Sequence, residues 1–182
     1  MRLLALGDSL TAGFGLAPED GFTARLERAL RARGREVTVL NAGVSGDTSA
    51  GGLARIDWTL ADKPTAALVA LGANDALRGI DPARTFENLD RIVARLKAEG
   101  IPTLLVGMLA PPNLGREYGE AFNALYPRLA AKHGVPLYEF FLDGVAAEPA
   151  LNQADGIHPN AAGVRVMVER MLPAVERLLA GV

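Results

Sequence analysis

Short apolar runs alternate with longer amphipathic stretches along the whole chain. Five apolar runs have the length and composition of strands, at residues 3–6, 36–40, 66–71, 101–106 and, more briefly, 136–138. Each is followed by a loop and then by a helical pattern. This alternation is typical of a parallel sheet covered by helices on both faces, and it predicts an α/β fold.

The clearest helical pattern covers residues 82–99. Asp81 suits the N-cap, Pro82 the first turn and Gly100 the position just past the last turn. The apolar positions follow the spacing i, i+3, i+4 and i+7, which forms one stripe facing a sheet. They are Leu89, Ile92, Val93 and Leu96.

A second amphipathic pattern ends the chain, with apolar positions at Val164, Val168, Met171, Val175 and Leu178. Pro173 lies inside it and is expected to kink or split the helix, because proline lacks the N–H that a helix interior needs. No repeat, linker or low-complexity stretch interrupts the chain. The sequence therefore predicts one domain over residues 1–182.

Composition narrows the possible functions. Hydrophobic residues make up 49% of the chain, charged residues 22%, and the net charge is −2. Neither nucleic acid nor an anionic membrane is an expected partner, and no apolar run approaches the roughly 18 residues that span a bilayer. We expect a monomer that acts on a small molecule, without stable membrane insertion. The absence of cysteine excludes thiol catalysis, disulfides and cysteine-bound zinc.

Polar residues gather where the predicted strands end. Residues 7–10 (Gly-Asp-Ser-Leu) follow the first strand, residues 41–48 the second and residues 72–75 the third, while residues 155–159 form a polar loop before the last helix. Ligands of open parallel sheets bind beyond the carboxyl ends of the strands. All four segments are therefore expected to meet at one rim.

The residue types at this rim are those required for acyl transfer. The Ser9 hydroxyl is a weak nucleophile until an imidazole accepts its proton, and the imidazole needs a carboxylate to fix its tautomer. Asp155 lies three residues before His158, so one turn can place the two side chains together. Backbone N–H groups of Ser9 and Gly43 and the side-chain amide of Asn74 are the expected donors to the oxyanion.

Each of these residues also has an ordinary structural interpretation. Ser9 alone could be an N-cap, Gly43 a turn glycine, Asn74-Asp75 a loop and cap pair, and 155–158 a loop capping the last helix. Asp8 is better explained as a loop acceptor than as a catalytic acid. Their joint occurrence at separate strand ends favours the catalytic interpretation.

Histidine is scarce, which narrows the choice of base. His133 stands where a helix ends, and that position explains it without catalysis. His158 is then the remaining candidate for the base. A catalytic zinc site, which usually takes two or three histidines, is disfavoured, and no cofactor or metal is expected.

Taken together, the four blocks resemble those of the SGNH (GDSL) hydrolase superfamily: Gly7-Asp8-Ser9-Leu10, Gly43, Gly72-x-Asn74-Asp75 and Asp155-x-x-His158. The intervening sequence is similar to the bacterial thioesterase I group, also described as lysophospholipase L1 and arylesterase. Supporting segments are 45–49, 52–55, 76–79, 120–123 and 155–160.

This resemblance implies a flavodoxin-like three-layer α/β/α fold with a five-stranded parallel sheet. It implies Ser9 as nucleophile, His158 as base and Asp155 as its partner, with the donors named above. It further implies activity on aryl esters, fatty acyl thioesters and lysophospholipids. Such enzymes are commonly exported, so we expect a periplasmic or secreted protein if an export segment preceded residue 1, and a cytoplasmic one otherwise.

The loop after the fourth strand is apolar and partly rigid. With Leu77 and Ile80, its residues Leu109 and Pro111 are expected to line a shallow groove for an acyl chain. The alternative is that these side chains only cover the edge of the sheet.

Three other functions fit the pattern less well. A carbohydrate acetylesterase would use the same residues, but aromatic residues make up only 5% of the chain and Trp58 is the only tryptophan. A non-catalytic binding module would not need the complete triad of Ser9, Asp155 and His158. A nucleotide-binding protein is disfavoured because residues 13–18 fail the dinucleotide fingerprint and no Gly-Lys-Ser/Thr phosphate loop occurs.

Overall fold

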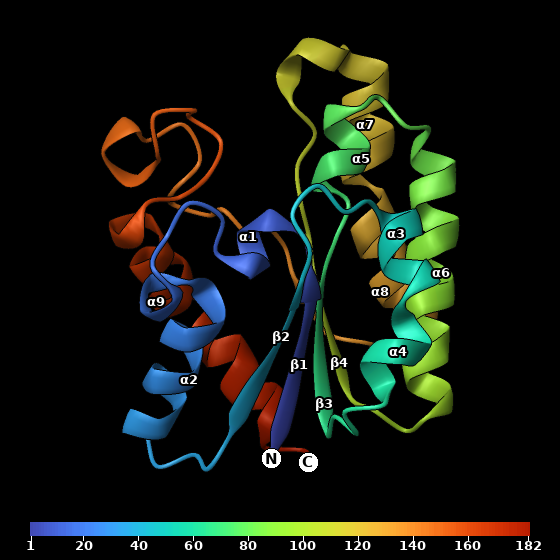
Figure 1. Cartoon of the computed structure of the whole chain (residues 1–182). Coiled ribbons are helices and arrows are strands. Elements are labelled where there is room, and N and C mark those ends of the chain that lie inside the picture. The colour runs from blue at the N-terminus through green and yellow to red at the C-terminus, as the bar shows by residue number, and fades with distance from the viewer.

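The computed structural model describes residues 1–182 and is built on a five-stranded parallel sheet in the order β2-β1-β3-β4-β5 (Figure 1). The strands are β1 Arg2–Gly7, β2 Thr38–Gly43, β3 Ala66–Ala70, β4 Thr103–Val106 and β5 Leu137–Tyr138. This is the flavodoxin-like strand order, and it confirms the predicted α/β fold.

The second strand differs from the prediction, which placed it at 36–40. β2 pairs with β1 from Thr38 to Gly43, so that Gly43 lies opposite Gly7. An edge strand is partly open to solvent, and the ladder therefore continues through Asn41, Ala42 and Gly43 after the run of large apolar residues has ended. Hydrophobic patterning alone does not detect that extension.

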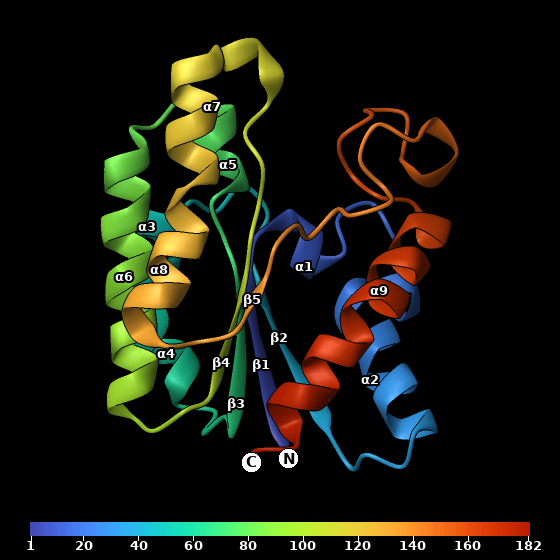
Figure 2. The same ribbon diagram turned by 180° about the vertical axis from the view of Figure 1, so that it is seen from behind.

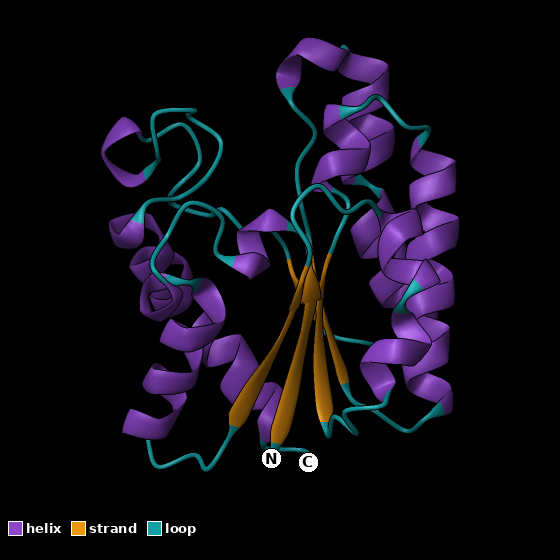
Figure 3. Cartoon of the chain, in the orientation of Figure 1, coloured by secondary structure: helices purple, strands orange, loops and turns teal.

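Helices cover both faces of the sheet (Figures 1, 2 and 3). One face carries α2 Phe22–Ala32 and α9 Ala161–Leu179; the other carries α3 Ser49–Ala54, α4 Ile56–Leu60, α6 Pro82–Ala98, α7 Arg116–Asn123 and α8 Leu125–His133. Two short helices, α1 Ser9–Ala12 and α5 Ala73–Leu77, follow the carboxyl ends of β1 and β3. The 3-10 turns are η1 Pro18–Asp20, η2 Pro112–Leu114 and η3 Pro149–Leu151.

Apolar side chains of the sheet and both helical layers form one core of 41 buried residues. The stripe predicted for α6 is completely buried, at Leu89, Ile92, Val93 and Leu96. Asp81 Oδ1 accepts from the Ala83 N–H at 2.9 Å, and Gly100 follows the helix with a φ of 69°. The predicted position and capping of this helix are confirmed.

Pro173 does not split the last helix, because α9 continues through it. Only one backbone hydrogen bond is lost at a proline, whereas the apolar residues of α9 on both sides of Pro173 are buried in the core. Burial of that stripe outweighs the local cost. No helix of the chain combines the length and the hydropathy needed to cross a lipid bilayer.

The sheet order also determines where a ligand can bind. From β1 the chain crosses to β2 on one side, and it then returns to β3 on the other side of β1. The loops that leave β1 and β3 therefore diverge and open a crevice at their carboxyl ends. Ser9 follows β1 and Asn74 follows β3, so both lie at this crevice.

Candidate active site

Ser9 is the first residue of α1, directly beyond the end of β1. Asp8 is the N-cap, and its Oδ1 accepts from the Leu10 N–H at 3.0 Å. Because Asp8 takes the capping role, the Ser9 hydroxyl is free for another partner. Gly7 permits this tight turn, since a Cβ there would lie 2.0 Å from Thr11 Oγ1.

The structure brings Ser9, His158 and Asp155 together in one chain of hydrogen bonds. His158 Nε2 lies 2.9 Å from Ser9 Oγ, and His158 Nδ1 lies 2.6 Å from Asp155 Oδ2. An ionised carboxylate only accepts hydrogen bonds, so Nδ1 carries the proton. Nε2 of a neutral ring is then left to accept the Ser9 hydroxyl proton.

Asp155 holds both the ring and the loop. Its Oδ1 accepts from the backbone N–H groups of Ile157, at 2.9 Å, and His158, at 3.0 Å. The His158 backbone N–H, the His158 ring and the Ile157 N–H together lower the pKa of Asp155 to about 2. The carboxylate therefore stays ionised over the whole range in which histidine titrates.

The segment around His158 is anchored by its neighbours rather than by regular secondary structure. An isolated antiparallel bridge joins Asn152 to Pro159, and the Gln153 N–H donates to the His158 carbonyl at 2.7 Å. Asn160 caps α9 by accepting from the Ala162 and Gly163 N–H groups. These contacts fix the ring at the edge of the crevice.

Phe14 is a site residue that sequence analysis missed. Its ring lies over the His158 imidazole, with centroids 4.5 Å apart and planes inclined by 38°. The Gln153 side-chain amide donates to the Phe14 carbonyl at 2.8 Å and to the Pro159 carbonyl at 3.0 Å. The loop after α1 is thereby tied to the loop that carries His158. No periodicity in the sequence signals a contact between such distant residues.

Asn74 is the second residue of α5 and lines the same cavity as Ser9 and His158. Its Nδ2 donates to the Asp47 carbonyl at 2.9 Å. A side-chain amide has two hydrogens, so one is used for this anchor and the other remains for a ligand. Asn74 therefore stands where the sequence predicted, with its orientation set by Asp47.

Asp75 has a different role from the expected cap. It lies within α5, almost fully buried, and its carboxylate accepts from the Ser49 N–H, the Ser49 hydroxyl and the Thr85 hydroxyl. These bonds connect α5 to the start of α3 and to α6. Asp75 thus fixes the helix that carries Asn74.

Gly43 does not present a free donor, contrary to the sequence expectation. Its N–H donates to Asn41 Oδ1 at 3.0 Å, and a Cβ at this position would lie 2.3 Å from the Ala12 nitrogen. A glycine is required here because β2 passes against the backbone of α1. The geometry gives Gly43 a packing role.

Gly46, three residues further on, has the features expected of a donor. Its N–H has no acceptor within the chain, its φ is +82°, and it precedes Asp47, whose carbonyl holds Asn74. The Ser9 N–H likewise has no acceptor. The glycine in Ser45-Gly46-Asp47 was the available signal, but sequence alone does not say which of two nearby glycines has its N–H engaged.

Asp8 is a second unusual carboxyl group at the site. Burial raises the pKa of Asp8 to about 6, against the opposing effect of the hydrogen bond from the Leu10 N–H. Because this pKa exceeds its value of about 3.9 in the unfolded chain, the stability that Asp8 contributes is complete below pH 4 and is lost as the pH rises through 6.

We therefore expect the stability of the Asp8→Asn variant to increase relative to that of the wild type as the pH rises. An asparagine keeps the Oδ1 acceptor for Leu10 but has no charge to desolvate. Between pH 5 and pH 8 the difference in unfolding free energy between variant and wild type should shift by about 1.4 kcal/mol. Urea unfolding at both pH values measures it, with the exposed Asp62→Asn as control; a pH-independent difference would contradict the prediction.

A cavity of about 430 Å³ opens beside Ser9 and His158. Leu77, Leu109 and Pro111 line it, as expected, and the lining also includes Phe140, Leu142, Ala146 and Ile157, which sequence analysis missed. His158 is the only ionisable residue in its lining. This composition suits an uncharged, apolar ligand.

Ile80 does not line this cavity, contrary to the prediction. Its carbonyl accepts from the Tyr118 hydroxyl at 2.8 Å, which fixes the loop between α5 and α6. Leu77 precedes the turn at Gly79, and Ile80 follows it. Residues three apart in sequence therefore come to lie on different sides of that turn.

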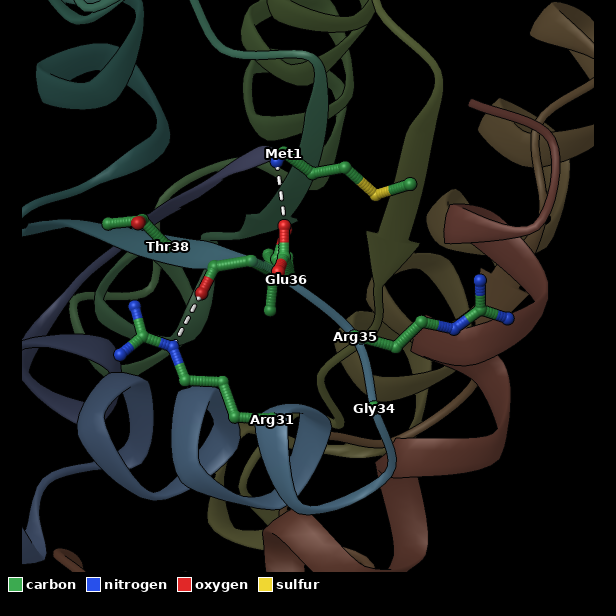
Figure 4. Close-up of a pocket in the computed structure, with 7 residues that line it drawn as sticks. Met1, Arg31, Gly34, Arg35, Glu36 and Thr38 are labelled. Carbon is green, nitrogen blue, oxygen red and sulfur yellow. Dashed lines mark hydrogen bonds between the residues drawn. The ribbon is translucent and has the colours of Figure 1, made fainter.

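A second cavity, of about 470 Å³, lies at the amino ends of β1 and β2 (Figure 4). The Met1 ammonium donates to the Glu36 carbonyl at 2.9 Å, and Arg31 Nε donates to the Val37 carbonyl at 3.0 Å. These cationic groups are thus already paired with backbone. Nowhere in the chain do three or more His, Asp or Glu side chains come close enough to hold a metal ion.

The chain is similar to proteins of known class. Residues 5–166 match the GDSL-like Lipase/Acylhydrolase family. A Pseudomonas aeruginosa protein described as Esterase TesA is 43% identical over 97% of this chain and 89% of its own length. The Thioesterase 1/protease 1/lysophospholipase L1 of Escherichia coli K12 is 43% identical over 87% of this chain and 75% of its own. A crystal structure of TesA superposes with a TM-score of 0.93 at 42% identity, covering 98% of this chain and 99% of that one.

Proposed function

The chain belongs to the GDSL-like lipase/acylhydrolase family and is an ester hydrolase; from this premise we propose that it cleaves acyl esters and thioesters with Ser9, His158 and Asp155. The observation that carries the proposal is the unbroken hydrogen-bonded series from Asp155 through His158 to Ser9 Oγ, which opens on an apolar cavity. Each group has the partner its role requires.

In the first half of the reaction, Ser9 Oγ attacks the acyl carbon while His158 Nε2 takes its proton. Asp155 stabilises the imidazolium and does not itself take a proton. The carbonyl oxygen becomes an oxyanion in the tetrahedral intermediate. When the intermediate collapses, His158 returns the proton to the departing alcohol or thiol, and the acyl group remains on Ser9.

In the second half, water attacks the acyl-enzyme. His158 again removes the proton, and collapse of the second intermediate releases the carboxylic acid and restores the Ser9 hydroxyl. Atoms and charges balance with water as the only co-reactant. The residues present therefore suffice for both half-reactions.

For the oxyanion we propose three donors: the N–H groups of Ser9 and Gly46 and the second hydrogen of Asn74 Nδ2. Gly46 takes the place first expected for Gly43, since the Gly43 N–H is engaged by Asn41. Such donors act on charge that develops only in the transition state.

Asn74→Ala is expected to lower kcat by about 10²–10³-fold with little change in KM. The variant removes one donor and leaves Ser9 and His158 in place. Steady-state kinetics with p-nitrophenyl butyrate measure the effect, and Asn113→Ala, at an exposed asparagine, serves as control. A rise in KM with unchanged kcat would assign Asn74 to ground-state binding instead.

The cavity supports an apolar acyl chain as the group recognised. Its lining includes Leu77 and the 109–112 segment together with Phe140, Leu142 and Ile157. An acetyl group would leave most of this volume unfilled, so the carbohydrate acetylesterase alternative has less support. The names of the relatives, an esterase and a thioesterase, support activity on both oxygen and sulfur esters.

Leu109→Ala is expected to lower kcat/KM for p-nitrophenyl octanoate about threefold to tenfold while leaving p-nitrophenyl acetate unchanged. The reason is the loss of apolar contact with the distal methylenes, each worth up to about 0.8 kcal/mol. Ile80→Ala is the matched control, because Ile80 lies outside the cavity lining. An equal loss on both esters would mean that Leu109 does not contact the chain.

Labelling with a p-nitrophenyl phosphonate ester tests the function directly. We expect one phosphonyl group per chain on Ser9, found by peptide mass spectrometry, with loss of hydrolysis in proportion to labelling. Ser9→Ala should take up none. Labelling at another residue, with activity lost in step, would overturn the assignment of Ser9 as nucleophile.

A further inference from the structure

The Arg55 side chain lies behind the crevice, at the junction of α3 and α4. Only 18% of the side chain is exposed. Nε donates to Asp47 Oδ2 at 2.7 Å, and Nη2 donates to the Gly7 carbonyl at 3.0 Å. The guanidinium therefore bonds two segments that lie far apart in the sequence.

Each partner of Arg55 is connected to a residue of the proposed site, Gly7 to Ser9 through the chain and Asp47 to Asn74 through a hydrogen bond. Gly7 ends β1 immediately before Asp8 and Ser9, and its carbonyl also accepts from the Val44 N–H at 3.1 Å, where the next loop begins. Asp47 closes that loop, since its N–H donates to the Val44 carbonyl at 3.0 Å. The Asp47 carbonyl then accepts from Asn74 Nδ2.

The direction in which the Asp47 carbonyl points depends on the contacts that hold the Asp47 side chain. The Asp47 carboxylate is only 15% exposed, and its ion pair with Arg55 is the one salt bridge it makes. A guanidinium carries several N–H donors in one rigid plane, so Arg55 can bond the Asp47 carboxylate and the Gly7 carbonyl at the same time. A lysine ammonium has all its donors on one nitrogen and cannot reproduce this geometry. Rotation of this residue would move the acceptor that orients the Asn74 amide.

We propose that Arg55 is a positioning residue for the oxyanion hole: through Asp47 it orients the Asn74 amide, and through Gly7 it fixes the turn that carries Ser9. This inference rests on the proposed function. Arg55 touches no reacting atom, and it is absent from the lining of the cavity. The alternative is that Arg55 only joins α3 to the sheet and contributes stability alone.

Arg55→Lys tests the proposal, because lysine keeps the positive charge but lacks the planar set of N–H donors that bonds both partners. We expect kcat for p-nitrophenyl butyrate to fall about tenfold to 100-fold, below the loss from removing Asn74 itself, with KM within about twofold. Affinity for a trifluoromethyl ketone, which forms a hemiketal oxyanion on serine, should fall in parallel. A lower melting temperature with unchanged kcat would overturn the proposal.

A double-mutant cycle separates positioning from a general effect on the fold. In an Asn74→Ala background, Arg55→Lys should lower kcat less than about threefold, because its main target is gone. The same fold-loss in both backgrounds would overturn the action through Asn74. Asp47→Asn, which weakens the ion pair from the other side, should repeat the kcat loss in smaller measure; unchanged kcat there would also count against the proposal.

Two controls make the outcome specific. Arg25→Lys removes a comparably shielded guanidinium that pairs with Asp20 on the α2 side of the sheet, and it should leave kcat unchanged. Ser9→Ala, run in the same assay, tests the proposed function separately. If Ser9→Ala is inactive while Arg55→Lys turns over normally, the role of Arg55 alone is wrong; if Ser9→Ala remains active, the proposed function itself fails.

Discussion

Replacing Ser9 by alanine is expected to lower kcat for ester hydrolysis by about four to six orders of magnitude. The variant removes the only atom proposed to bond the acyl carbon, so no acyl-enzyme can form. The fold should be unaffected, because Asp8 rather than Ser9 caps α1. Residual turnover would come from binding and the oxyanion donors acting on water.

The measurement is a panel of p-nitrophenyl esters and acyl thioesters, assayed with wild type and variant in parallel. Ser45→Ala is a suitable control, since Ser45 is exposed and adjacent to the donor loop. Circular dichroism and the melting temperature show whether the variant is folded. Retention of more than about one hundredth of wild-type activity in a folded Ser9→Ala protein would exclude Ser9 as nucleophile.

His158→Ala is expected to lower kcat by a similar number of orders of magnitude. Without the imidazole the Ser9 hydroxyl keeps its proton, and the leaving group receives none. Because Ser9 and His158 act as one unit, the double variant should be scarcely less active than either single variant. Additive losses would indicate that the two side chains act independently.

The other histidine provides the control for this prediction. His133 Nε2 lies 2.7 Å from Asp90 Oδ1, which joins the end of α8 to α6. Its loss should therefore affect stability and leave turnover unchanged. A large fall in kcat for His133→Ala, measured on folded protein, would contradict the assignment of His158 as the only base.

These effects differ in size because the residues act at different distances from the reacting carbon. In the proposed mechanism, Ser9 forms and breaks bonds, His158 transfers the proton, Asn74 stabilises charge and Arg55 holds Asp47, whose carbonyl orients Asn74. Removing a residue that lies further from the reacting carbon leaves more of the interactions that stabilise the transition state intact. The expected losses in kcat are therefore similar for Ser9 and His158, smaller for Asn74 and smallest for Arg55.

Some parts of the fold could be predicted from local sequence because their causes are local. The apolar stripe of α6, its Asp81 cap and Gly100 lie within a few turns of each other, and all were found where expected. β3 is buried on both faces and consequently reads as a continuous apolar run. The edge strand β2 extended further than its apolar residues, and α9 continued through Pro173, since pairing and packing outweighed local preference in both.

The candidate site divides in the same way. Ser9, Asp155 and His158 could be named from residue type and order, because their chemistry leaves few substitutes. The choice between Gly43 and Gly46 could not be made, since it depends on which N–H already has an acceptor. The sequence also could not predict that Phe140 and its neighbours line the cavity, or that the Phe14 ring lies over His158. In both cases the residues in contact come from distant segments of the chain.

The sequence by itself determined the strand and helix order, the family resemblance and which side chains are proposed to react. Periodicity, capping and reactivity are properties of a residue and its near neighbours, and they can be read along the chain. The tertiary structure alone decided which amides are free, which side chains enclose the cavity and that Arg55 bonds both the Gly7 carbonyl and the Asp47 carboxylate. Those features depend on distances between segments that only folding brings together.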